Sequence, residues 1–201
     1  MKIILPLLLT VLLGIAISCS KTKHQTQPKI AETASINGKG FSQSQDTTKN
    51  YEVQKTKEEW KKLLTTSQYR ILREGGTELP YINKYYDNEK EGVYYCAACG
   101  QPLYTSKTQY HSGTGWPSFW APIKSSAVKE KEDHSLFMTR TEIVCSRCGS
   151  HIGHVFNDGP QPTGLRYCMN STAMVFVPMD LSKVDPDTLS PINVRKLENK
   201  D

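Results

Sequence analysis

Two cysteine pairs constrain the fold of this chain more than any other feature of its sequence. Cys96 and Cys99 form the first pair and Cys145 and Cys148 the second; each pair encloses two residues and is followed directly by a glycine. Two thiolates on one tight turn can bind one side of a metal ion, and two such turns complete the tetrahedral four-cysteine site of structural zinc. The trailing glycines suit the positive φ that these turns need. Such a metal would join two hairpins that lie far apart in the sequence, whereas a pair of disulfides remains the alternative.

The first 18 residues are predicted to be a lipoprotein-type signal peptide. Lys2 provides a small basic start, residues 3–18 are mostly apolar, and small residues stand directly before Cys19. The apolar stretch is shorter than the roughly 20 residues needed to cross a bilayer, and its small-residue end fits a processing site. A cysteine at that point resembles the lipobox of bacterial lipoproteins, so Cys19 is the predicted site of lipidation. An ordinary secretory signal and an uncleaved anchor stay open as alternatives.

Residues 19–50 are predicted to form a flexible, lipidated tether. They are rich in Ser, Thr, Gln and Lys and offer little apolar material to bury. Their five lysines against one Glu and one Asp, together with Lys2, account for four of the five net positive charges of the chain. The basic character therefore belongs to the tether, and no cationic face for nucleic acid is indicated. We expect an exported, membrane-anchored protein whose body faces a bacterial periplasm.

Residues 51–180 are expected to fold as one domain, followed by a C-terminal tail at 181–201. A capping box at 56–59 predicts a first helix with Trp60 on its apolar face, and a second helix is expected over 67–74, ended by two glycines. Beyond it, short runs rich in Tyr, Val, Phe and Thr predict strands over 93–95, 135–144, 151–156 and 165–177. The fold class is therefore mainly β and antiparallel, with short N-terminal helices.

Cys168 is the cysteine that neither a metal pair nor the leader explains. In a strand over 165–170, alternation places Cys168 on the same face as Arg166 and Asn170. The arginine favours the reactive thiolate, and the amide can hold a polar group of a substrate. Cys168 is therefore the candidate nucleophile. The competing interpretation is a buried inert cysteine, the common fate of a free thiol.

A second group of polar side chains precedes this strand and consists of His151, His154 and Asp158. A histidine close to a thiol can lower the pKa of that thiol or deliver a proton, and Asp158 could fix the tautomer of the ring. In a regular strand the two histidines point to opposite faces, so both reach one pocket only if the chain twists or kinks at Gly153. A structural role for one of them stays open.

An aromatic loop supplies the third candidate element. Two glycines flank Thr114, and Trp116 and Pro117 follow directly. A tryptophan presented in this way could form an apolar wall that receives a methyl or thioether group. A place in the core is the ordinary alternative for Trp116, and it is the interpretation we adopt for Trp120.

Three motifs together resemble the B-type methionine sulfoxide reductases. They are Gly-Trp-Pro-Ser-Phe at 115–119, His-Ile-Gly-His-Val-Phe at 151–156 and Arg-Tyr-Cys-Met-Asn at 166–170, within a resemblance that runs from about residue 51 to 179. The resemblance implies two antiparallel β-sheets with N-terminal helices and a structural zinc ion remote from the active site. It implies as substrate the R-epimer of methionine sulfoxide, mainly within proteins.

The same resemblance implies roles for the candidate residues. Cys168 attacks the sulfoxide sulfur, which yields methionine and a cysteine sulfenic acid. Trp116 cradles the methyl group, and His154 and Asn170 with water hold or protonate the oxygen. The electrostatics are set by Arg166, His151 and Asp158. One structural zinc per chain is the expected cofactor, and no organic cofactor is implied.

One departure from the family pattern concerns how the enzyme is recycled. Many members carry a resolving cysteine in the loop where this chain has Thr114. With no spare thiol, we expect an external reductant, a thioredoxin-like partner, to reduce the sulfenic acid, and we expect the chain to act as a monomer. Two other classes stay open: a thiol peroxidase that uses Cys168, and a non-enzymatic zinc-knuckle module that binds protein or nucleic acid.

Overall fold

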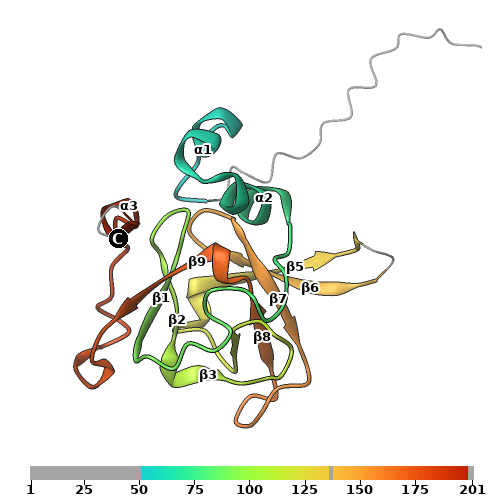
Figure 1. The fold of residues 1–201 in the computed structure, drawn as a ribbon, viewed down its shortest axis with the longest axis vertical. Coiled ribbons are helices and arrows are strands. Elements are labelled where there is room, and N and C mark those ends of the chain that lie inside the picture. The colour runs from blue at the N-terminus through green and yellow to red at the C-terminus, as the bar shows by residue number, and fades with distance from the viewer. Residues whose placement is uncertain (1–50, 136–137, 199–201) are drawn as a thin grey trace, which may run out of the picture. The chain divides into compact units, whose positions relative to one another are not determined.

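The structure is a computed structural model that describes residues 51–135 and 138–198 (Figure 1). The predicted signal peptide, the tether and Cys19 lie outside the described residues. Three helices are described, and they are α1 (Lys57–Leu63), α2 (Thr66–Glu74) and α3 (Arg195–Glu198). The strands are β1 (Gly92–Cys96), β2 (Pro102–Thr105), β3 (Gln109–Tyr110), β4 (Ser118–Phe119), β5 (Val128–Asp133), β6 (Arg140–Cys145), β7 (His151–Phe156), β8 (Arg166–Met169) and β9 (Met174–Pro178). Within the described ranges, no helix combines the length and the apolar character needed to span a bilayer.

The strands form two antiparallel sheets. One sheet has three strands in the order β2-β1-β9, and the other has six in the order β3-β4-β8-β7-β6-β5. The predicted fold class, mainly β with two antiparallel sheets and short N-terminal helices, is confirmed. Strand β8, which carries Cys168, lies inside the larger sheet between β4 and β7, so that side chains from both neighbours surround the thiol.

An aromatic core connects the two sheets. Tyr94 from β1 and Tyr104 from β2 are fully buried, and both rings contact the buried ring of Phe119 from β4. The ring centroids of Tyr104 and Phe119 lie 4.5 Å apart in a stacked arrangement, and those of Tyr94 and Phe119 lie 5.1 Å apart, edge to face. Such pairs contribute about 0.5–1.5 kcal/mol beyond the burial of their apolar area. They fix β4 against the smaller sheet and so hold one side of β8.

The N-terminal helices form where the sequence predicts them. Thr56 caps α1, its capping box with Glu59 is complete, and Trp60 is 2% exposed. Helix α2 begins at Thr66, one residue earlier than predicted, and ends at Glu74. Gly75 caps it with a φ of 68°, the left-handed conformation that glycine favours. Arg73 of α2 lies over the ring of Trp60 and donates a hydrogen bond to the carbonyl of Cys148. The helices are thereby attached to the second cysteine pair.

Two of the predicted strands were wrong in extent. In the described part of the run 135–144, β6 begins only at Arg140. Strand β5 was missed because its alternating lysines and acidic residues carry no apolar period. β5 forms the edge of its sheet, where charged side chains are expected. The run 165–177 is two strands in different sheets, β8 and β9, separated by a 3₁₀ turn at Ser171–Ala173.

Part of the segment predicted as a C-terminal tail packs on the smaller sheet. Leu181 is buried in a second apolar cluster with Val93 and Tyr95 of β1, and Ile192 packs against the same cluster. The backbone N–H of Ile192 also donates a hydrogen bond to the carbonyl of Gly100, at 3.0 Å. Residues 181–194 thus cover β1 rather than extend away from it.

Candidate active site and metal centre

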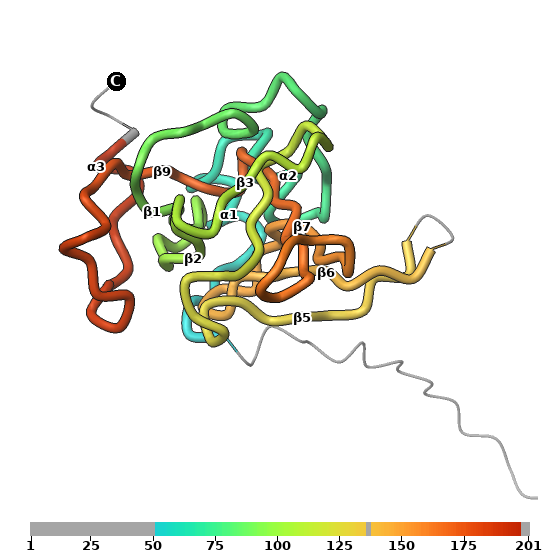
Figure 2. Tube along the Cα trace, turned by 90° about the horizontal axis from the view of Figure 1, so that it is seen from below, coloured from blue at the N-terminus to red at the C-terminus, as the bar shows by residue number. Residues whose placement is uncertain are grey.

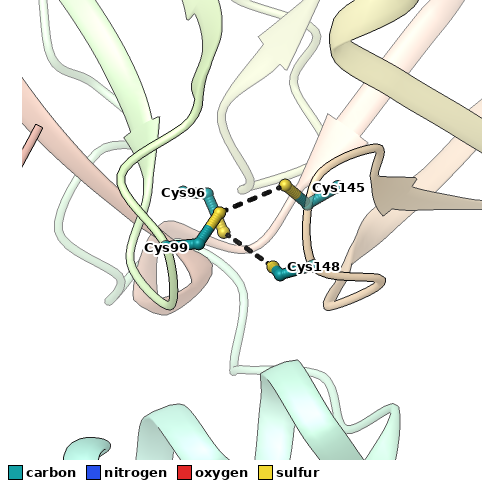
Figure 3. Close-up of side chains that lie close together, drawn as sticks. All are labelled: Cys96, Cys99, Cys145 and Cys148. Carbon is teal, nitrogen blue, oxygen red and sulfur yellow. Dashed lines mark hydrogen bonds between the residues drawn. The ribbon is translucent and has the colours of Figure 1, made fainter. Parts of the chain in front are cut away.

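The two cysteine pairs come together in one cluster (Figure 3). Cys96 and Cys99 lie at the turn between β1 and β2, and Cys145 and Cys148 lie at the turn between β6 and β7. The sulfur atoms lie within 4.8 Å of one another, at 3.8 Å for Cys96 and Cys148 and 3.6 Å for Cys99 and Cys145. Four thiolates at about 2.3 Å from zinc stand about 3.8 Å apart in a tetrahedron, so the cluster fits one such ion. The cysteines at 51–135 and 138–198 form no disulfide.

The turns around this cluster have the geometry that the sequence predicts. Gly100 and Gly149 take φ values of 73° and 69°. A Cβ on Gly100 would lie 1.8 Å from the carbonyl oxygen of Ile192, so a side chain there would overlap the backbone. Hydrogen bonds from the neighbouring thiols, Cys145 first, hold the pKa of Cys148 far below its usual range. The cluster joins a hairpin of each sheet, as the separation of the pairs predicted.

Cys168 lies in a row of side chains that crosses the larger sheet. It is directly opposite Ser118 on β4 and His154 on β7, and His154 is in turn opposite Glu142 on β6. Residues directly opposite in an antiparallel sheet point to the same face, so the four side chains are neighbours. The predicted alternation along β8 is confirmed: Tyr167 and Met169 are buried, whereas Arg166 and Cys168 are half-buried on the other face.

A cavity of about 140 Å³ opens over this face beside Cys168. It combines aromatic walls with polar groups from three strands, β6, β7 and β8, and from the loops beside them. Its lining residues are Thr77, Trp116, Arg140, Gly153, His154, Phe156, Cys168, Met169 and Asn170. The structure therefore brings together four of the predicted site residues, Cys168, His154, Asn170 and Trp116, in one pocket.

The orientation of His154 is set by Asp133, a residue that the sequence did not suggest. Nε2 of His154 lies 2.8 Å from Oδ2 of Asp133, and Arg140 donates to the same oxygen at 2.7 Å. Hydrogen bonds from Ser135, then His154, hold the pKa of Asp133 far below its usual range. Burial lowers the pKa of His154, and the bond to Asp133 opposes this only in part. At neutral pH the ring is therefore neutral, with its proton on the nitrogen that faces Asp133.

His151 lies on the same face but outside the pocket. A bulge at Ile152 adds one residue to β7 opposite the Ile143–Val144 step of β6, and the centroids of the two histidine rings are 5.3 Å apart. The predicted irregularity is thus present, one residue before Gly153. Nδ1 of His151 lies 2.7 Å from Oε1 of Glu142. His151 is 4% exposed and supports the ring of His154 from behind rather than lining the cavity.

The predicted role of Asp158 in fixing a histidine tautomer was wrong. Both oxygens of Asp158 accept hydrogen bonds from Arg166 at 2.8 Å, and this pair holds the pKa of Asp158 below its usual range. The chain turns back between β7 and β8, which places Asp158 beside β8 instead of beside either histidine. The guanidinium of Arg166 also lies 4.4 Å from the ring centroid of Phe156, so Asp158 positions a cation next to the pocket wall.

The pKa of the Cys168 thiol reflects two opposing influences. Burial raises this pKa and is the larger effect, while the positive charge of Arg166 and hydrogen bonds from Thr114, Arg166 and Ser118 lower it. Oγ1 of Thr114 lies 3.9 Å from Sγ of Cys168. Arg166 acts in the predicted direction, but the pKa stays above its usual range. Cys168 therefore rests mainly as the thiol at neutral pH.

Glu78 connects two sides of the pocket and was missed by the sequence analysis. Its backbone carbonyl accepts a hydrogen bond from Nε1 of Trp116 at 3.2 Å, and its backbone N–H donates to Oδ1 of Asn170 at 3.1 Å. Its carboxylate accepts hydrogen bonds from the backbone of Ser171 and from the backbone and hydroxyl of Thr172. Nδ2 of Asn170 donates to the carbonyl of Ile152, which leaves one amide hydrogen for a ligand. Trp120, expected in the core, is half-buried.

Residues 64–178 match the SelR domain, which is more than half of the chain. The chain belongs to the SelR domain family. Three relatives carry the name peptide methionine sulfoxide reductase MsrB. The protein of Leptospira interrogans is 58% identical, over 63% of this chain and 97% of its own length. The protein of Methanosarcina barkeri is 60% identical, over 62% of this chain and 87% of its own length. The protein of Pseudomonas savastanoi is 54% identical, over 63% of this chain and 96% of its own length. The family indicated by the three sequence motifs is therefore confirmed.

The SelR match encloses the whole candidate site. Cys168, the four paired cysteines and the residues of the pocket all lie between 64 and 178, and so do the unpredicted Glu78, Asp133 and Glu142. The capped helix α1 and residues 181–194 lie outside the match and pack around it. The family thus accounts for the pocket and the cysteine cluster together.

Proposed function

We propose that this chain reduces the R-epimer of methionine sulfoxide in proteins to methionine, through a sulfenic acid at Cys168 that an external thiol then reduces. The observation that carries the proposal is the pocket over β8, where one thiol lies beside a neutral histidine, a free amide hydrogen and a tryptophan. The relatives named as peptide methionine sulfoxide reductases support the same reaction.

Cys168 and His154 supply the nucleophile and the proton. Because burial raises the pKa of Cys168 and lowers that of His154, the resting pair is a thiol and a neutral imidazole. Asp133 holds the proton on Nε2, so Nδ1 of His154 is the nitrogen that accepts the thiol proton when substrate arrives. The thiolate attacks the sulfoxide sulfur, and the imidazolium gives its proton to the sulfoxide oxygen. Asp133 stabilises the imidazolium while it lasts.

The products follow from electron balance. The sulfur–oxygen bond of the substrate breaks, the sulfoxide gains two electrons and becomes methionine, and the Cys168 sulfur loses two electrons and carries the oxygen as sulfenic acid. Trp116 and Phe156 form the apolar walls for the methyl and thioether groups. The remaining amide hydrogen of Asn170 is suited to hold the sulfoxide oxygen, and Arg166 with Asp158 keeps a positive charge beside the thiolate.

Recycling requires a reductant from outside the chain. The hydroxyl of Thr114 lies 3.9 Å from the thiol of Cys168, and no other cysteine lines the pocket. Two thiols of a thioredoxin-like partner reduce the sulfenic acid to thiol and water and become a disulfide. The four paired cysteines take no part in this step, since they hold one structural zinc ion that joins the two sheets.

The proposal includes a location at a membrane. A leader that ends at Cys19 supports export and lipidation, with residues 19–50 as the tether and a body facing the bacterial periplasm. Growth with a labelled fatty acid tests this directly. A Cys19→Ser chain that keeps the label and stays in the membrane fraction would disprove lipidation at this residue.

Single-turnover chemistry tests the catalytic proposal. One equivalent of a blocked methionine R-sulfoxide, without reductant, should yield one methionine and a sulfenic acid at Cys168 that a dimedone-type probe traps and peptide mapping locates. The S-epimer should give neither product. Cys168→Ser should give no methionine while it keeps its metal content and its melting temperature, because a hydroxyl of ordinary pKa is a poor nucleophile toward sulfur.

Three results would contradict the proposal. Methionine formation by Cys168→Ser would place the nucleophile elsewhere, and faster oxidation of Cys168 by hydrogen peroxide than by the sulfoxide would favour a thiol peroxidase. A disulfide between Cys168 and one of the paired cysteines would make the cluster a redox partner. Thr114→Cys serves as a positive control, since a thiol at that place should convert the trapped sulfenic acid into a disulfide with Cys168.

A further inference from the structure

Three large apolar side chains lie exposed in one short loop between α2 and β1. Leu79 is 67% exposed, Tyr81 55% and Ile82 77%. Among the described residues only Met138 joins them as an exposed large hydrophobic side chain. Single exposed apolar residues are common on protein surfaces, but a contiguous patch marks a binding surface more often than chance. Residues 79–82, called the apolar loop below, carry no charge.

The structure holds the apolar loop in a fixed and strained conformation. Tyr81 has a φ of 65°, which a non-glycine residue adopts at a cost of about 1–3 kcal/mol. Its hydroxyl donates to the carbonyl of Gly113 at 2.6 Å, and its backbone N–H donates to the carbonyl of Gly115 at 2.8 Å. Asn83 donates to the same carbonyl of Gly115 at 2.6 Å. These bonds keep Leu79 and Ile82 directed outward instead of letting the loop collapse.

The apolar loop adjoins the rim of the Cys168 pocket. It begins one residue after Glu78, which binds both Trp116 and Asn170. Its partners Gly113 and Gly115 belong to the loop that carries Trp116, and Figure 2 shows the segment between α2 and β1 passing beside the segment that follows β3. Hydrogen bonds thus connect the apolar loop and its neighbour Glu78 to the segment of Trp116 and to Asn170, two residues that line the pocket.

The size of the pocket decides what lies there. A cavity of about 140 Å³ is smaller than the roughly 300–1,000 Å³ of sites that enclose a whole small ligand. It has room for one side chain, so the remainder of a polypeptide substrate must lie across the rim. Methionine is mostly buried in folded proteins and has apolar neighbours, which become exposed when the protein unfolds.

We propose that the apolar loop is a docking surface for apolar residues that flank the methionine sulfoxide in an unfolded polypeptide. This inference rests on the proposed function and adds the substrate class: uncharged, apolar sequence context is preferred over charged context and over the free amino acid. Leu79 and Ile82 supply the contact area, and the bonds of Tyr81 keep it in place at no further entropic cost on binding.

The test compares three R-sulfoxide substrates in single turnover by the full chain: a blocked amino acid, a pentapeptide with leucine on both sides of the sulfoxide, and one with aspartate. Wild type should favour the leucine peptide. In the double variant Leu79→Ser, Ile82→Ser, the concentration of leucine peptide that gives half the maximal rate should rise about tenfold, and the maximal rate should not change. This is the effect of losing part of two apolar side chains that the substrate buries. The blocked amino acid should react as with wild type.

A matched variant keeps the test specific. Leu79→Ile with Ile82→Leu exchanges the two side chains, preserves the apolar area and should behave as wild type. Equal losses on all three substrates, or no loss on the leucine peptide, would refute the docking surface. A defect that appears only in multiple turnover would assign the loop to the reductant and refute it as well. Absence of turnover by wild type with every sulfoxide would instead defeat the proposed function, and the inference with it.

Discussion

Removal of the Glu78 carboxylate should lower activity although Glu78 touches no substrate. The carboxylate accepts three hydrogen bonds, from the N–H of Ser171, the N–H of Thr172 and the hydroxyl of Thr172, the last two at 2.9 and 2.8 Å. Hydrogen bonds to a charged acceptor contribute about 1.5–3 kcal/mol each, and partial exposure reduces this, so Glu78→Ala should lower the free energy of unfolding by about 2–4 kcal/mol.

The effect on catalysis follows from the backbone of the same residue. Its carbonyl and N–H bind Trp116 and Asn170, so a loosened Glu78 displaces two walls of the pocket together. Displacement of positioning groups by about 1 Å can lower the rate of an enzyme by about 100-fold. We therefore expect kcat/KM for a blocked R-sulfoxide to fall by roughly 10- to 100-fold. Glu78→Gln keeps one acceptor oxygen and should show an intermediate loss.

Two measurements separate positioning from general instability. The assay is run well below the melting temperature of each variant, with alkylation of Cys168 by iodoacetamide as a second readout; alkylation should stay near the wild-type rate because the thiol and Arg166 are untouched. Glu89→Ala is the control, since Glu89 is 84% exposed in its side chain and pairs only with the exposed His111. A Glu78→Ala enzyme with lowered stability and unchanged kcat/KM would refute the reasoning.

Two further predictions concern the metal and the thiol. Purified protein should hold about one zinc ion per chain. Cys99→Ser should lose this ion, and its melting temperature should fall by several degrees, because a four-thiolate site couples metal binding to folding. Metal analysis and calorimetry check this, and a metal-free chain of unchanged stability would contradict it. Because burial raises the pKa of Cys168, its alkylation rate should increase with pH through and above the usual thiol range, and Arg166→Met should raise that pKa further and slow alkylation at neutral pH by about tenfold. An alkylation rate that is flat from pH 6 to 9 would show a thiolate already formed.

The sequence predicted what depends on neighbours along the chain. Alternation on β8 identified the face of Cys168, the two C-x-x-C-G turns predicted one joint cluster, and the capping box located α1. These features are local, since a strand period, a turn and a helix cap each involve only a few consecutive residues. The resemblance to a family supplied the two sheets, which local patterns alone had left as an undivided set of strands.

What the sequence missed depends on pairing between strands. Asp133, Glu142 and Glu78 act on His154, His151 and Asn170 across distances of 21, 9 and 92 residues along the chain. Register between β5, β6 and β7 brings the first two to their histidines, and one sequence does not specify that register. Asp158 was misassigned for the converse reason: it is close to His154 in the chain, but the turn before β8 delivers it to Arg166.

The cross-strand arrangement supports sulfoxide reduction, as proposed above, over the alternative of a thiol peroxidase. The nucleophile in both sulfoxide reduction and peroxide reduction is the thiolate, and a thiol whose pKa is raised by burial reacts slowly with any oxidant that brings no means of removing its proton. In the proposed mechanism His154 provides that means within the pocket, and it returns the proton to an oxygen held by His154 and Asn170, two residues that line the same cavity as Trp116. In the proposed reaction a sulfoxide fills this space with its methyl group against the indole and its oxygen at the polar side. Hydrogen peroxide has no apolar group to place there, so it gains little from Trp116 and Phe156, and the pocket favours the sulfoxide through contacts that only this substrate makes.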